Sequence, residues 1–111
     1  MLELIVGTYV LVNLFAPVSE PDKIEAAIND LIWCESRGDE FAINKDEIHG
    51  TSYGILQYRL STLYHFADRY GIERADPLDP EFQKAVAREM IKDKRAHEHW
   101  ACWDIMKLSY E

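Results

Sequence analysis

The chain has 111 residues, enough for one small domain with its own core, and 48% of them are hydrophobic, which excludes a disordered chain. Twelve Lys and Arg residues against twenty Asp and Glu residues give a net charge of −8. Nucleic acids and anionic membrane surfaces bind clusters of cations, so neither is expected as a partner.

Residues 1–18 form an apolar N-terminal segment. Its apolar run extends from Leu4 to Val18 and is shorter than the roughly 20 residues that a membrane-spanning helix needs. It is similar to the apolar region of a secretory signal, although Glu3 stands where such signals carry a cation. We expect an exported protein, extracellular or in the cell envelope. A packed apolar element and a weak anchor are the alternatives for this segment.

A first helix is predicted to begin after Ser19. Pro21 and Asp22 follow it, which is the pattern of a capped helix start. Apolar residues then recur with the period of one helix face, at Ile24, Ala27, Ile28, Leu31 and Ile32. The next position of this apolar stripe is Glu35, and Gly38 is the expected C-cap.

The helical period is lost in residues 39–58, where short apolar pieces alternate with Asn, Asp and Gly. We expect a long loop or a small hairpin there. A second helix is predicted after it, capped by Ser61 and ending at Gly71. Asp79 and Pro80 predict the start of a third helix. Its core side is expected to be formed by Phe82, Val86 and Met90.

Glu35 is the residue in this pattern that calls for a chemical explanation. A carboxyl group on the core side of a helix loses hydration, which raises its pKa and favours the protonated form. A protonated carboxyl group is what a general acid requires. The structural alternative is that Glu35 points sideways into water at the end of the helix.

The segment GTSYGILQY, residues 50–58, begins fifteen residues after Glu35. Its glycines permit tight turns and a close approach of a ligand to the backbone. Its hydroxyl, amide and flat aromatic groups suit a sugar ring, and they belong to Ser52, Tyr53, Gln57 and Tyr58. The Gly-x-Ser-x-Gly pattern also occurs in serine hydrolases, but no strand clearly leads into it here and no convincing acid–histidine pair follows.

The segments CES, AIN and GTSYGILQY together resemble the catalytic core of the lysozyme-like superfamily. The closest patterns are those of soluble lytic transglycosylases and of resuscitation-promoting-factor domains, and the resemblance covers residues 22–103. It implies a mainly α, α+β lysozyme-like fold in a single domain, residues 19–111, with a Gly-rich loop or short hairpin lining the cleft. The Ala-Tyr-Asn-x-Gly motif of many lytic transglycosylases is absent, and Trp100 and Trp103 are candidates to replace part of that wall.

The resemblance also implies a role for each matching residue. Glu35 is the single catalytic acid. The substrate-binding positions are Asn44, Ser52, Tyr53, Gly54, Gln57 and Tyr58, and the supporting ones are Ser36, Thr62 and Trp103. The cysteine count alone leaves open two buried thiols or one disulfide. Resuscitation-promoting-factor domains pair a cysteine before the glutamate with one beside a C-terminal tryptophan, which implies a Cys34–Cys102 disulfide.

The implied activity is cleavage of the β-1,4 bond between N-acetylmuramic acid and N-acetylglucosamine, by a lytic transglycosylase or a muramidase. The partner would be a peptidoglycan strand bound by a monomer, with no cofactor and no metal, because His97 and His99 diverge on a helix and no ligand set completes them. A hydrolytic route would need a second acid, for which Asp39, Asp46 and Glu47 are candidates. The alternative is a non-catalytic glycan-binding or structural domain of the same fold.

Overall fold

The computed structural model describes residues 19–106 and shows an α+β arrangement. The elements are α2 (Glu20–Ser36), a hairpin of β1 (Ile43–Asp46) and β2 (Gly50–Tyr53), α3 (Leu60–Arg69), α4 (Pro80–Lys92), the 3-10 helix η1 (Ala96–Glu98) and α5 (Ala101–Met106). The apolar segment 1–18 lies outside the described residues. None of the helices in the described part is long and apolar enough to cross a membrane.

Helix α2 begins and packs as its sequence predicts. The Ser19 hydroxyl accepts a hydrogen bond from the backbone N–H of Asp22, and Pro21 lies in the first turn. The residues of the apolar stripe from Ala27 to Ile32 are buried. The C-cap differs from the prediction by one residue, because Arg37 has the left-handed backbone conformation (φ 57°) that ends the helix and Gly38 follows with φ 83°.

The starts of α3 and α4 are determined in different ways. The predicted Ser61 cap is wrong, because α3 begins at Leu60 after Arg59 and has no side-chain cap. The preceding residue, Tyr58, is fully buried, so packing fixes where this helix starts. The predicted start of α4 is confirmed, since the Asp79 carboxylate accepts from the backbone N–H groups of the first turn.

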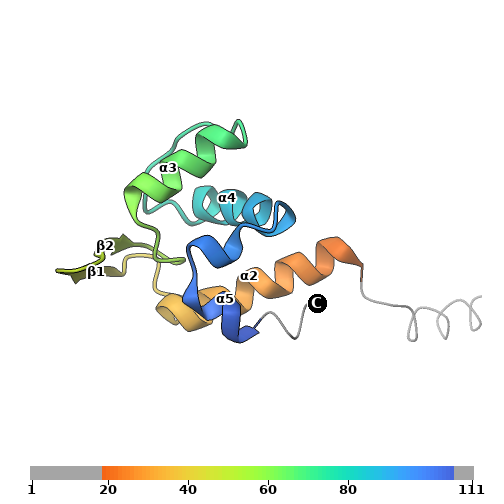
Figure 1. Ribbon diagram of the computed structural model, residues 1–111, viewed down its shortest axis with the longest axis horizontal. Coiled ribbons are helices and arrows are strands. Elements are labelled where there is room, and N and C mark those ends of the chain that lie inside the picture. The colour runs from red at the N-terminus through yellow and green to blue at the C-terminus, as the bar shows by residue number, and fades with distance from the viewer. Residues whose placement is uncertain (1–18, 107–111) are drawn as a thin grey trace, which may run out of the picture.

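Helix α4 lies at the centre of the domain. It packs against both α2 and α3, and Figure 1 shows it between them. Among the described residues, the buried side chains are apolar except for two amides, those of Gln57 and Gln83, and Gln83 is fully buried. The fully buried apolar residues include Leu31, Leu56, Tyr58, Leu63, Val86, Met90 and Trp100.

A disulfide and a hairpin complete the fold near the end of α2. The Cys34–Cys102 disulfide joins α2 to α5 with a Cα–Cα distance of 6.4 Å, which confirms the predicted pair. The hairpin is antiparallel, with Ile43 opposite Tyr53, and strand β1 is exposed along its whole length. Figure 1 shows it projecting from the domain on the side where α2 ends.

Candidate active site

Glu35 lies in the last turn of α2, one turn beyond Leu31 of the apolar stripe. Its side chain is half-buried. Within residues 19–106 its carboxyl group has no hydrogen bond and no ion pair. Burial therefore acts alone: loss of hydration raises the pKa of Glu35 above its ordinary value.

Other carboxyl groups of the domain show the opposite electrostatic setting. A hydrogen bond from Arg88 lowers the pKa of Glu25, and one from Arg74 lowers that of Asp68. The pKa of Asp93 is lowered first by the Tyr70 hydroxyl and then by Arg69. Glu35 thus differs from these groups in being partly desolvated without a donor or cation to stabilise its charge.

Ser36 joins the end of α2 to the segment of residues 54–58, which we call the anchored loop. Its hydroxyl donates to the backbone carbonyl of Ile55 at 2.7 Å and accepts from the N–H of Gly38 at 3.2 Å. The resemblance implies a supporting role for this residue. In the structure it fixes the position of the helix end relative to the anchored loop.

The anchored loop is also held from the C-terminal side of the domain. The indole N–H of Trp100 donates to the Leu56 carbonyl at 2.8 Å, and Nε2 of His99 lies 3.2 Å from the Gln57 carbonyl. A pair of hydrogen bonds between the backbones of Tyr53 and Tyr58 closes the loop at its base. Trp100, a candidate for the substrate wall, is thus fully buried beneath the loop.

Gln83 of α4 is the residue at this site that the sequence analysis missed. Its fully buried amide accepts from the N–H of Leu56 at 2.9 Å and donates to the carbonyls of Tyr53 (2.9 Å) and Pro77 (2.6 Å). A Cβ atom at Gly54, whose φ is 78°, would overlap this amide. The detectable signal was a polar residue on an apolar stripe, the same signal that singled out Glu35.

Two predicted substrate-binding residues are instead core residues in this structure. The side-chain nitrogen of Gln57 donates to the carbonyls of Ala42 and Gly54, and its oxygen accepts from the Asn44 amide at 2.6 Å. Gln57 therefore ties the anchored loop to the start of the hairpin. Tyr58 is fully buried, and its hydroxyl donates to the backbone carbonyl of Gln83. Burial leaves neither side chain a face for a sugar.

The remaining predicted residues keep some exposure. Ser52 and Tyr53 are half-buried on β2, where Ser52 is paired with Asn44 of β1. Thr62 is half-buried in the first turn of α3. Asn44 is exposed on β1, where its amide nitrogen donates to Gln57.

The candidate second acids lie at different points beyond α2. The backbone N–H of Asp39 bonds to the Ser36 carbonyl, which keeps Asp39 within one turn of the helix end. Asp46 lies at the hairpin turn, and its hydrogen bonds, first that with the His49 ring, lower its pKa to about 2. Glu47 is exposed at the same turn. Asp39 is the candidate that the backbone holds nearest to Glu35 along the chain.

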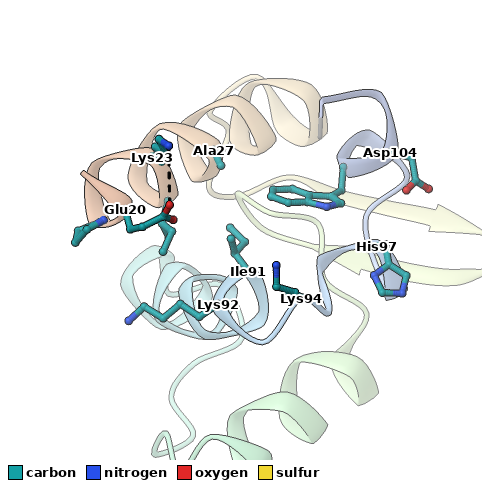
Figure 2. Close-up of a pocket in the computed structure, with 11 residues that line it drawn as sticks. Glu20, Lys23, Ala27, Ile91, Lys92, Lys94, His97 and Asp104 are labelled. Atoms are coloured by element: carbon teal, nitrogen blue, oxygen red, sulfur yellow. Dashed lines mark ion pairs between the residues drawn. The ribbon is translucent and has the colours of Figure 1, made fainter. Parts of the chain in front are cut away.

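A cavity of about 680 Å³ lies between the first half of α2, the end of α4 and α5 (Figure 2). We call it the α2–α4 cavity. Trp103 is the one predicted site residue that lines it, and Glu35 does not. Ala27 of its wall precedes Glu35 by eight residues, a helical rise of about 12 Å. Within residues 19–106, no group of three His, Cys, Asp or Glu residues is placed to hold a metal ion.

Comparisons with known proteins found no family model that matches the chain, no matching curated protein and no matching solved structure.

Proposed function

We propose that this protein is a lysozyme-like, peptidoglycan-cleaving enzyme of the cell envelope or extracellular space, acting as a lytic transglycosylase or a muramidase. The observation that carries the proposal is Glu35, a half-buried carboxyl group with a raised pKa and no partner within residues 19–106. Supporting it, Ser36 fixes this helix end to the anchored loop, and the motif that contains the loop resembles that of lysozyme-like enzymes.

The chemistry requires one group that first gives a proton and then accepts one. Protonated Glu35 would donate to the bridging oxygen as the bond from the muramyl anomeric carbon breaks. The resulting carboxylate would then accept the proton of the muramyl 6-hydroxyl while that oxygen bonds to the anomeric carbon. This sequence restores protonated Glu35 and yields an anhydro end. In the hydrolytic variant water attacks instead, and Asp39 is the favoured second acid.

The decisive experiment compares digestion of purified peptidoglycan by the wild-type protein and by Glu35→Gln. The amide cannot donate the required proton, so we expect release of muropeptides to fall by at least roughly a hundredfold. Glu40→Gln, which changes an exposed acid in the turn that follows α2, is the matched control and should retain activity. Mass analysis distinguishes the routes, because an anhydro product lacks one water.

The same comparison distinguishes the alternative function. Wild-type protein that sediments with insoluble peptidoglycan but releases no muropeptide would indicate a glycan-binding or structural domain. A Glu35→Gln variant with substantial residual turnover would remove Glu35 from its catalytic role.

The raised pKa of Glu35 gives two pH expectations of known sign. Activity that needs the protonated form should fall as pH rises through the raised value. The stability contribution of this group is present below its ordinary pKa of 4.5 and is lost as pH rises through the folded-state pKa. Glu35→Gln should therefore be at least as stable as wild type at neutral pH, which thermal unfolding measures.

A further inference from the structure

The α2–α4 cavity combines an apolar wall with cationic side chains. Ile24 and Ala27 of α2, Ile91 of α4 and Trp103 of α5 form its apolar part. Lys23, Lys92 and Lys94 also line it, although the whole chain is strongly acidic. A volume of about 680 Å³ falls within the range of cavities that bind small organic molecules.

The three lysines differ in how their charges are compensated. Lys23 lies 3.9 Å from Glu20, and Lys92 lies 3.2 Å from Glu89. Lys94 has no ion pair within residues 19–106. Figure 2 shows its side chain directed from the end of α4 into the space below α2. The cavity therefore holds one cation without a protein carboxylate as partner.

Lys94 also occupies a backbone position that favours glycine. The N–H of Arg95 bonds to the Met90 carbonyl and the N–H of Lys94 bonds to the Ile91 carbonyl, which is the Schellman arrangement at the end of a helix. In this arrangement the residue that follows the C-cap takes a left-handed conformation. Here that residue is Lys94, with φ 58°. A lysine there is strained relative to glycine, and its side chain carries a charge that glycine would not.

We propose that the α2–α4 cavity binds a small organic carboxylate with an apolar body, its carboxylate on Lys94 and its body against Ile91 and Trp103. A carboxylate gives Lys94 the charge partner that it lacks, and the apolar wall gives area for the body of the ligand. This inference does not rest on the proposed peptidoglycan activity.

The experiment titrates the full chain with three probes that share a benzyl group and differ in charge: phenylacetate, phenylacetamide and benzylamine. Chemical shifts of the backbone amides of Ile91, Lys94 and Trp103 report binding in the cavity. We expect phenylacetate to bind at least about tenfold more tightly than the neutral amide, since a charged hydrogen bond is worth that much. Acetate, which has no apolar body, should bind more weakly than phenylacetate.

The variant Lys94→Gly removes the charge at a position where glycine is the favoured residue. It should keep or raise the melting temperature and abolish the preference for phenylacetate over phenylacetamide. Lys84→Ala, on α4 but outside the cavity, is the control and should keep that preference. A melting temperature of Lys94→Gly at or above that of wild type would show that a loss of binding is not due to unfolding.

Three outcomes would overturn the proposal: no shift at these amides with any probe, equal binding of phenylacetate and phenylacetamide to the wild type, or tightest binding of benzylamine. A further probe, N-acetylphenylalanine, places the same ring and carboxylate at a peptide carboxyl end. The ratio of its Kd to that of phenylacetate distinguishes a peptide terminus from a free small molecule as the source of the carboxylate.

Discussion

The anchored loop and the hairpin are neighbours in sequence and belong to one motif, but the domain holds them very differently. Leu56 and Tyr58 of the loop are fully buried, and hydrogen bonds reach its backbone from α2, α4 and the segment before α5. Strand β1 is exposed along its length, and Ile48 at the hairpin turn is 86% exposed. The loop side of the candidate site is thus part of the core, whereas the hairpin side is held mainly by the hydrogen bonds between its own two strands.

The largest effect is expected from removing the central anchor of the loop. Gln83→Leu keeps the volume close to that of glutamine but leaves the buried N–H of Leu56 and the partly buried carbonyl of Pro77 without this partner, while the Tyr53 carbonyl keeps its bond from the Tyr58 N–H. Each group that loses its partner costs about 1–3 kcal/mol, so we expect a loss of roughly 4 kcal/mol in the free energy of unfolding. Urea denaturation measures it.

Lys84→Leu is the control for this substitution, one residue further along α4. Its surface ion pair with Glu81 is worth less than about 1 kcal/mol. Similar losses in Gln83→Leu and Lys84→Leu would show that the loop is not anchored in the way its hydrogen bonds indicate.

The next effect comes from His99, whose charged form is disfavoured by burial. Burial lowers its pKa to about 4 from an ordinary value of 6.5, and its Nδ1 is buried without a partner within residues 19–106. As pH falls from 6.5 to 4, the unfolded chain binds a proton that the folded chain does not. The free energy of unfolding should therefore decrease by about 3 kcal/mol over that range.

The variant His99→Phe tests this assignment, because phenylalanine can retain the stacking on Tyr58 but does not titrate. It should lose the acid-induced decrease in stability between pH 6.5 and 4. His65→Gln changes an exposed histidine and should retain it. An equal pH dependence in wild type and His99→Phe would assign the decrease to other groups.

The smallest effect is expected at the hairpin. Ile48→Ser alters a side chain that is almost fully exposed, so the free energy of unfolding should change by less than about 0.5 kcal/mol. Thermal unfolding of the two proteins measures the difference. A loss comparable to that of Gln83→Leu would mean that the hairpin shares the core support of the loop.

The helices were predictable from the sequence wherever a cap and an apolar stripe agreed. Ser19 and Asp79 cap the starts of α2 and α4, and the stripe between Ile24 and Ile32 continues to Glu35. The start of α3 was not predictable from Ser61, because burial of Tyr58 overrides the local capping preference. No periodic pattern marked the six residues of α5, which the disulfide attaches to α2.

The candidate site was predictable at Glu35 and less so around it. The environment of a carboxylate on an apolar stripe can be predicted from the sequence, because neighbouring stripe residues show which side of the helix faces the core. The environment of the polar residues in GTSYGILQY cannot be predicted in this way, since an amide such as Gln57 can face a ligand or satisfy buried backbone groups equally well. Tertiary structure alone decides between these two uses. Here it also brings Gln83, which is distant in sequence on α4, into hydrogen-bond contact with the loop.

The disulfide has a consequence for how the protein responds to proteases. Residues 34–102, which include the exposed hairpin, lie within one covalent ring. A single cut at the hairpin turn would open that ring without releasing either fragment, so the nicked protein would migrate as two bands only after reduction. At this exposed hairpin, one cleavage therefore leaves the domain in one piece.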